Sequence, residues 1–253
     1  MHAQVSFPTP QTAVLTITGG GPLNILGTPV IRALTAQLAE LAERPGLHCL
    51  VLRGSGTRAF VAGADIREMA SLDAASARAF ISGLRDLCNA VRHFPVPVIA
   101  RLQGHTLGGG LELAMAADLR IAADDAVVGM PEVKVGIPSV VEAALLPRLI
   151  GWGRTSWLLL TGDNISAAKA EAWGLVEIVV PAANIDAAIE HCVNSIAVEA
   201  TPLAMRAQKR LMRRWERLPL DEAVQAGIDA FAQSVAEGEH LERMSAFINR
   251  KKK

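Results

Sequence analysis

Strand-like and helix-like hydrophobic patterns alternate along the first 180 or so residues. Apolar residues alternate with polar ones over 13–18, and compact apolar runs at 47–53 and 96–102 are bounded by glycine or proline, as buried strands are. Residues 29–42, and an alanine-rich segment that ends near Phe94, carry apolar residues at helical spacing. This alternation is typical of an α/β domain.

The pattern changes near residue 184. From there to the end, helical spacing dominates, with breaks at Pro202 and Pro219. We therefore expect residues 1–183 to form an α/β core that holds the functional site, and residues 184–253 to form a helical region.

The stretch that follows the apolar run at 96–102 contains three consecutive glycines. It reads Gly104-His-Thr-Leu-Gly-Gly-Gly-Leu-Glu112, which predicts a turn and a helix that begins near Gly109. Unpaired N–H groups and the positive end of a helix dipole suit an oxygen that gains negative charge during a reaction. A tight strand-to-helix connection is the alternative, and a phosphate-binding loop is excluded because no Gly-Lys-Ser/Thr follows.

Two other segments are candidates for chemistry. Ala62-Gly63-Ala64-Asp65 is a small-residue turn after a strand-like segment, although an ordinary turn would look the same. Glu132 follows Pro131 among apolar residues, where a carboxyl group could have a raised pKa and exchange a proton. A surface glutamate is the alternative.

Composition narrows the possible partners and compartments. The 25 basic and 25 acidic residues balance, so there is no electrostatic signature for nucleic acid or for a membrane surface. No apolar run reaches the roughly 18 residues of a membrane span, and the first residues lack a signal-peptide pattern. Cys49, Cys88 and Cys192 lie far apart, which favours free thiols in a reducing compartment. We expect a cytoplasmic protein without a metal site.

Taken together, residues 59–66, 104–112 and 130–138 resemble the crotonase (enoyl-CoA hydratase/isomerase) superfamily in order, spacing and chemistry. The resemblance covers nearly the whole chain. It implies a spiral of β-β-α units with a C-terminal helical trimerisation region, and hydration of the C2=C3 bond of 2-enoyl-CoA thioesters to 3-hydroxyacyl-CoA. It also implies an acyl-CoA substrate, a homotrimer or dimer of trimers, and no metal or redox cofactor.

The resemblance assigns roles to individual residues. Ala64 and Gly109 match the positions whose backbone N–H groups form the oxyanion hole for the thioester carbonyl. Glu112 and Glu132 match the two glutamates of the hydratases. By this resemblance Glu112 would deprotonate the water that attacks C3, and Glu132 would supply the proton at C2, with one carboxyl group ionised and the other protonated.

The resemblance also places the substrate. The CoA portion is expected to run near Arg58, Ala59 and Ala62, with the acyl chain directed toward the helix that begins near Asp65. Further contacts are expected from Ile66, Met69, Val140, Val235 at the far end, and Lys251 reaching the CoA phosphates of a neighbouring subunit.

One loop departs from the family pattern. Residues 136–143 read Gly-Ile-Pro-Ser-Val-Val-Glu-Ala where the family has a glycine-rich loop, apparently one residue longer. Glu142 would either face the pocket or cap its own helix. The departure leaves the acyl chain open and keeps a double-bond isomerase or another crotonase-type lyase as alternatives. An RNA-binding or assembly protein is a third reading, which the neutral net charge disfavours.

Overall fold

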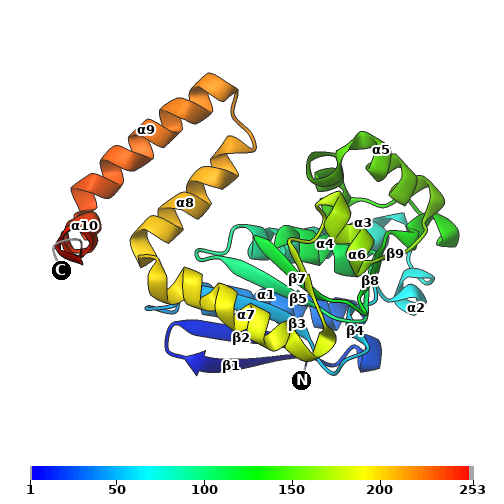
Figure 1. The fold of residues 1–253 in the computed structure, drawn as a ribbon. Helices are drawn as coiled ribbons and strands as arrows, with labels where there is room; N and C mark the ends of the chain where they lie inside the picture. Colours follow the sequence, from blue (N-terminus) through cyan, green and yellow to red (C-terminus); the bar gives the residue numbers. More distant parts are fainter. Residues whose placement is uncertain (1, 251–253) are drawn as a thin grey trace.

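A computed structural model of the chain describes residues 2–250. It contains two β-sheets wrapped by helices, with a group of C-terminal helices that extends from the body (Figure 1). The strands are β1 (Ala3–Thr9), β2 (Thr12–Ile17), β3 (Cys49–Gly54), β4 (Ala59–Val61), β5 (Val98–Leu102), β6 (His105–Leu107), β7 (Leu119–Ala123), β8 (Val127–Gly129), β9 (Ile165–Ser166) and β10 (Ile178–Val180).

Ten α-helices and several short helical segments connect and cover these strands within residues 2–250. The α-helices are α1 (Thr28–Ala42), α2 (Ile66–Met69), α3 (Ala74–Arg92), α4 (Gly109–Ala116), α5 (Leu146–Thr161), α6 (Ala167–Trp173), α7 (Ile185–Asn194), α8 (Pro202–Trp215), α9 (Leu220–Glu237) and α10 (Glu239–Arg250). The short segments are η1 (Gly21–Leu23), η2 (Pro131–Val135), η3 (Val141–Leu145), η4 (Ala182–Asn184) and the π-helical η5 (Ser195–Glu199).

Strands that are consecutive in sequence enter different sheets. The larger sheet has the order β1-β2-β3-β5-β7-β10, and the smaller has the order β4-β6-β8-β9. From β3 to β8, the first strand of each pair joins the larger sheet and the second joins the smaller one, with helical segments after each pair. Within each sheet these strands are parallel. The repeated β-β-α unit therefore winds into a spiral, which confirms the predicted fold class.

The main hydrophobic core fills the space between the sheets and helices α1, α3 and α4. Leu52 and Ala100 from the larger sheet share this core with Leu34 from α1 and Leu84 from α3. The parallel strands are buried on both faces and read as continuous apolar runs, as such strands do. The core fixes the ends of β4 and β6, from which the site begins.

A smaller core lies on the opposite face of the larger sheet. Ile185 and Ile189 of α7 pack there against Val51 and Ile99. The first helix of the predicted C-terminal region thus covers the sheet, whereas α9 runs back beside α8, away from the body (Figure 1). None of the helices between residues 2 and 250 is both long and apolar enough to cross a membrane.

Two local features differ from the sequence pattern. The N-terminal strand β1 was not predicted, because its residues are mostly exposed and include Pro8, yet it pairs antiparallel with β2 at the edge of the sheet. The helical segment predicted up to Phe94 is divided, since Asp73 caps a new helix. Its side chain accepts the N–H of Ser76, and the Ser76 hydroxyl receives the N–H of Asp73, which is a capping box.

Candidate active site

A mostly apolar cavity of about 110 Å³ lies where the smaller sheet meets α3 and α4. Two carboxylates, those of Glu112 and Glu132, line it. The other lining residues are Ala62, Gly63, Ala64, Ile66, Met69, Phe80, Ile81, Leu84, Leu107, Gly108, Gly109, Pro131, Val135, Ile137, Pro138 and Val140. Carboxylates converging in an apolar cavity are typical of a site for acid–base chemistry.

The backbone at Ala64 turns one N–H group toward the α4 terminus. Leu26 forms a parallel bridge with Ala64: its N–H donates to the Gly63 carbonyl at 2.9 Å, and its carbonyl accepts the Asp65 N–H at 3.0 Å. In a parallel bridge the middle residue's own N–H points away from its partner. The Ala64 N–H group is therefore directed away from Leu26 and is free to meet a ligand.

A second backbone donor lies beside the first. Gly109 is the first residue of α4, so its N–H has no partner within the helix. A side-chain carbon built on Gly109 would lie 3.9 Å from the Ala64 nitrogen and 3.1 Å from Leu84 Cδ2. Only a residue without a side chain leaves this space open. The two residues predicted as an oxyanion hole are thus neighbours in the structure.

Gly108 brings both carboxylates to the same turn. Its φ of +52° suits glycine, and a side-chain carbon there would overlap Glu132 Oε1. On the other side of the turn, Glu112 Oε2 lies 3.9 Å from the position of a Gly109 side-chain carbon. The turn is therefore flanked by Glu112 and Glu132.

Glu112 lies in the first turn of α4 and is only 2 % exposed. Burial raises the pKa of its carboxyl group to about 8, and the negative charge of Glu132 adds to the shift. Hydrogen bonds from the backbone N–H groups of Ala143 and Val140 lower the pKa, while the charge of Glu142 raises it. Within the described residues, Glu112 Oε1 is buried and has no hydrogen-bond partner, so it can meet a water molecule or a substrate.

Glu132 is held from the loop that departs from the family pattern. It lies in η2 after Pro131 and is partly exposed. The Ser139 hydroxyl donates a 2.8 Å hydrogen bond to Glu132 Oε2. That hydrogen bond leaves Oε1 facing the glycine turn.

The other predicted residues divide into two groups. Ala62, Ile66, Met69 and Val140 line the cavity, and Asp65 caps the α2 helix by accepting the N–H groups of Arg67 and Glu68.

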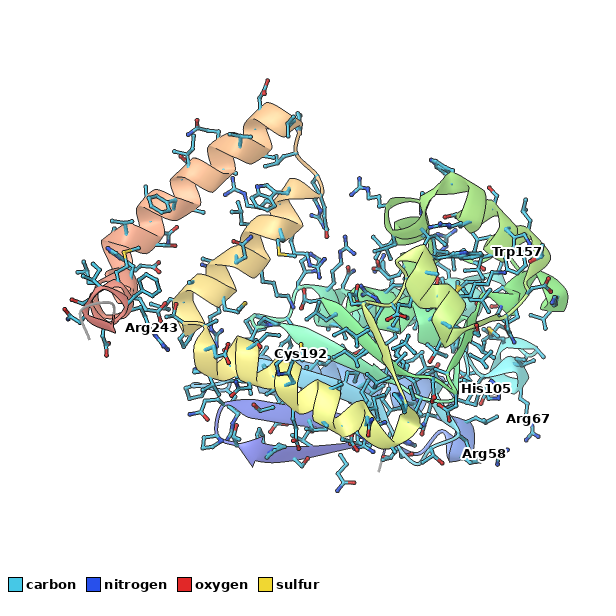
Figure 2. All side chains as sticks on the ribbon, in the orientation of Figure 1. Arg58, Arg67, His105, Trp157, Cys192 and Arg243 are labelled. Carbon is cyan, nitrogen blue, oxygen red and sulfur yellow. The ribbon has the colours of Figure 1, made fainter. Side chains whose placement is uncertain are left out.

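The remaining predicted contacts lie outside the cavity lining. Ala59 is a buried residue of β4, and the exposed Arg58 neighbours His105, whose N–H donates to the Arg58 carbonyl (Figure 2). Val235 is on α9, away from the cavity (Figure 1), and Lys251 is outside the described residues. The CoA-contact roles of these residues stay predictions.

The sequence left two roles open for Glu142, which were to face the pocket or to cap its own helix. The structure shows a third role, an ion pair. It lies at the start of η3, 8 % exposed, and its carboxylate pairs with Arg92 of α3. Its charge still acts on Glu112 at the cavity.

Sequence reasoning missed the α3 wall of the cavity, formed by Phe80, Ile81 and Leu84. The helical spacing of these residues predicts a buried face, but does not say which cavity that face lines. Ser139 was also missed, since a serine in a loop of altered length has no pattern that identifies its partner.

Comparisons with known proteins agree with this geometry. The family model described as enoyl-CoA hydratase/isomerase matches residues 9–253. A short-chain-enoyl-CoA hydratase of Clostridium acetobutylicum is 32 % identical over 96 % of this chain and 93 % of its own length. A crotonyl-CoA hydratase of Syntrophomonas wolfei is 35 % identical over the same shares of the two chains.

The fold agrees equally well with a solved structure. The crystal structure of an enoyl-CoA hydratase from Bacillus anthracis has a TM-score of 0.94 at 32 % identity, and the match covers 99 % of this chain and 97 % of that one. The predictions of the crotonase superfamily and of a hydro-lyase of the enoyl-CoA hydratase type are confirmed at this level. By its sequence and its fold, the chain belongs to the enoyl-CoA hydratase/isomerase family.

Proposed function

We propose that this chain hydrates short 2-enoyl-CoA thioesters, with Ala64 and Gly109 binding the thioester oxygen and Glu112 and Glu132 handling the protons. One observation carries the proposal. Two carboxylates flank a glycine turn whose helix start presents a free N–H group next to that of Ala64.

The chemistry requires stabilisation of a developing negative charge. Addition of water at C3 of a 2-enoyl thioester pushes electrons onto the carbonyl oxygen, which becomes enolate-like. Backbone N–H groups aimed at that oxygen stabilise it, and removal of one such donor typically costs about 2.7–4 kcal/mol of transition-state stabilisation. Because the donors are backbone groups at Ala64 and Gly109, small residues are required there.

The two glutamates divide the proton transfers. Glu112 removes a proton from the water whose oxygen bonds to C3, and Glu132 donates a proton to C2. After one turnover Glu112 is protonated and Glu132 is ionised, so one proton must return from Glu112 to Glu132 through water. The added water supplies all the atoms, and acid–base chemistry needs no metal or redox cofactor.

The size of the cavity favours a short acyl group. Met69, Phe80 and Leu84 wall the cavity, and these large side chains narrow the space for the acyl group. The names of the two relatives, a short-chain-enoyl-CoA hydratase and a crotonyl-CoA hydratase, support the same substrate class. The CoA portion would extend from Ala62 toward Arg58 and Ala59.

We also propose that the C-terminal helices join copies of this chain into a trimer or a dimer of trimers. Helix α9 carries a row of exposed apolar residues on one face, opposite to the face that packs on α8. The row consists of Leu220, Val224, Ile228, Phe231 and Val235. An exposed apolar surface of this kind marks an interaction site. The resemblance implies that in such an assembly Val235 would close the far end of the acyl pocket and Lys251 would reach the CoA phosphates of a neighbouring subunit.

Hydration of crotonyl-CoA tests the proposed activity. The purified chain should abolish the absorbance of the conjugated thioester, and Glu112→Gln or Glu132→Gln should each reduce the rate by at least about a hundredfold. Enoyl-CoAs with longer or branched chains should react more slowly. Unchanged absorbance with every enoyl-CoA would refute the proposal.

The altered loop keeps isomerisation as the second candidate, because Ile137 and Val140 of this loop wall the cavity beside Glu132. An isomerase needs a single carboxylate to move one proton. If Glu112→Gln retained full activity on a 3-enoyl thioester while Glu132→Gln abolished it, isomerisation would replace hydration.

A further inference from the structure

The loop that contacts Glu112 contains a backbone conformation that is unfavourable for its residue. Val141 has a φ of +47°, which is costly for a β-branched side chain. Val140, which precedes it, lines the same cavity as Glu112, and hydrogen bonding by the backbone of Val140 and Ala143 lowers the pKa of the Glu112 carboxyl group. The Ala143 N–H also donates to the Val140 carbonyl at 2.9 Å. Something must hold this loop in its unfavourable shape.

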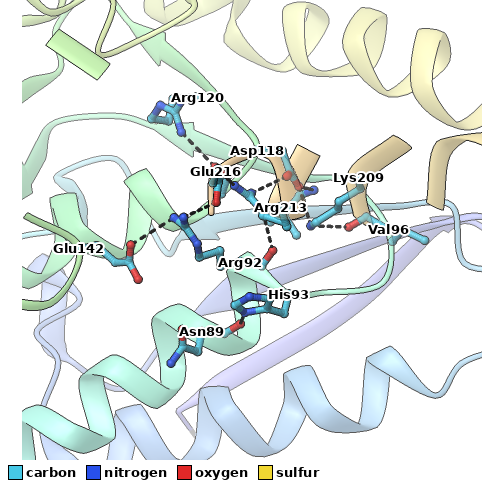
Figure 3. A network of polar contacts seen from close by, with 12 residues as sticks. Asn89, Arg92, His93, Val96, Asp118, Arg120, Glu142, Lys209, Arg213 and Glu216 are labelled. Carbon is cyan, nitrogen blue, oxygen red and sulfur yellow. Dashed lines mark hydrogen bonds and ion pairs between the residues drawn. The ribbon is translucent and has the colours of Figure 1, made fainter. Parts of the chain in front are cut away.

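Glu142, which follows Val141, anchors the loop through an ion pair. Its Oε2 lies 3.4 Å from Arg92 Nη1, and both side chains are about nine-tenths buried. Arg92 also pairs through Nη2 with Glu216, which follows α8. Arg92 is the last residue of α3, so it links the loop both to α3 and to the segment that follows α8 (Figure 3).

The pair belongs to a larger chain of alternating charges. Arg213 bridges Glu216 and Asp118 at 2.7 Å each, and Lys209 pairs with Asp118 at 2.6 Å (Figure 3). Asp118 also accepts the N–H of Val98 at 2.7 Å, which fixes the network to β5. Glu142, Glu216 and Asp118 thus face Arg92, Arg213 and Lys209. Removal of Glu142 would leave Arg92 paired with Glu216 alone and would detach the loop from this network.

We propose that Glu142 is a positioning residue: its ion pair with Arg92 holds the 140–143 loop so that the Val140 and Ala143 N–H groups face Glu112. The inference rests on the proposed function of Glu112 as the base. Residues 140–143 contain no glycine, so this segment needs an anchor to keep Val141 at its positive φ.

The sign of a pH shift distinguishes positioning from a direct charge effect. The titratable groups that face Glu112 are Glu132 from η2, Glu142 from η3 and Cys88 from α3. The charge of Glu142 raises the pKa of Glu112, whereas the two N–H groups of the loop lower it. If Glu142 acted through its charge alone, its removal would lower that pKa. If it positions the loop, its removal releases the donors and raises the pKa.

Glu142→Ala tests the inference through the pH profile of kcat/KM for crotonyl-CoA hydration. We expect the limb set by Glu112 to move to higher pH by about half a unit to one unit, which lowers kcat/KM at pH 7 about threefold to tenfold. The rate at pH 9 should approach that of the wild type, and KM should change little. Glu142→Gln should shift the limb less, because its amide can still accept a hydrogen bond from Arg92.

A rescue variant keeps the test independent of folding. Glycine adopts a φ of +47° without strain, so Val141→Gly combined with Glu142→Ala should return the limb toward its wild-type position. Asp186→Asn is the matched control, since it breaks another Arg–carboxylate pair, with Arg101, on the α7 side of the larger sheet. It should leave the limb in place.

The possible outcomes separate the inference from the function on which it rests. A limb that stays in place or moves to lower pH in Glu142→Ala would overturn the positioning role, as would a double variant that shows no recovery. Glu112→Gln is measured alongside. If Glu112→Gln hydrates crotonyl-CoA at the wild-type rate, the proposed role of Glu112 is wrong. If Glu112→Gln is inactive, that role stands, and the Glu142→Ala profile then tests only the positioning role of Glu142.

Discussion

At the scale of single residues, burial and neighbouring charges set the pKa of Glu112. The carboxyl group sits in the first turn of α4, where the helix dipole favours the ionised form, yet burial dominates and raises its pKa to about 8. Desolvation disfavours the charged form, and the charge of Glu132 adds to it. Glu112 is therefore mainly protonated at neutral pH and becomes a competent base as the pH rises.

The pH dependence of kcat/KM follows from this pKa. The proposed step needs Glu112 ionised and Glu132 protonated at the same time, so kcat/KM should follow the singly protonated pair of carboxyl groups and pass through a maximum, with the limb set by Glu112 near pH 8. Initial rates with crotonyl-CoA between pH 6 and 9.5 measure the profile. A profile without a limb near pH 8 would contradict the raised pKa of Glu112.

Gly108 offers a second test at this scale. Gly108→Ala would push a methyl group into Glu132 Oε1, and displacement of a catalytic group by about 1 Å can cost about a hundredfold in rate. We expect kcat to fall by about that factor in the crotonyl-CoA assay.

The matched control is Gly136→Ala. Gly136 also has a positive φ, +83°, but nothing lies within 4 Å of its added carbon. Gly136→Ala therefore has the backbone strain of Gly108→Ala but no contact with a catalytic side chain. This variant should be less stable than the wild type and keep most of its activity. Equal losses of activity in the two variants would contradict the placement of Glu132 beside the turn.

At the scale of elements, the approach of α4 to β4 positions the site. A side-chain carbon on Gly110 would overlap the Val61 carbonyl oxygen and Cβ, so α4 lies against the backbone of β4. This contact sets the distance between the Gly109 N–H of α4 and the Ala64 N–H, which follows β4 in sequence.

Gly110→Ala should therefore lower both stability and activity. Overpacking against a backbone that cannot yield typically costs about 1–3 kcal/mol, measurable as a lower midpoint of urea unfolding. Gly153→Ala in α5 is the control, because nothing lies within 4 Å of its added carbon. It should raise stability by about 0.5–1 kcal/mol. A Gly110→Ala variant as stable and active as the wild type would contradict the close contact of α4 and β4.

At the scale of the whole molecule, the exposed face of α9 should hold the assembly together. Phe231, 69 % exposed, lies in the middle of the apolar row. Phe231→Glu should convert the assembly to monomers, because a charge cannot be buried there without a partner. Light scattering after size-exclusion chromatography measures the mass. Ala236→Glu adds the same charge to an exposed position of α9 outside the row and should leave the mass unchanged. A wild-type chain that is already monomeric would overturn the proposed trimer.

Structural features that depend on residues close together in the sequence could be predicted, whereas features that depend on distant segments could not. The glycine turn, the start of α4 and the buried strands follow from spacing and glycine chemistry within a few residues, and they were predicted close to their observed bounds. Strand β1 was missed because its stability comes from pairing with β2 at an edge, which a pattern of exposed residues does not reveal.

The parts of the site that were missed depend on contacts between distant segments. Arg92 and Glu142 are fifty positions apart, and no local pattern pairs them. Likewise, the burial that raises the pKa of Glu112 comes from packing of α3, α4 and η3. No local pattern indicated that burial would raise the pKa of Glu112.

The most direct test of hydration by the Glu112 and Glu132 pair follows the oxygen of water into the product. Crotonyl-CoA is incubated with the chain in heavy-oxygen water, and the product is analysed by mass spectrometry. We expect a product heavier by one labelled water molecule, with the labelled oxygen on C3, and no such product within the same time from Glu112→Gln or Glu132→Gln. A wild-type product of unchanged mass, or labelled product formed equally fast by either variant, would contradict it.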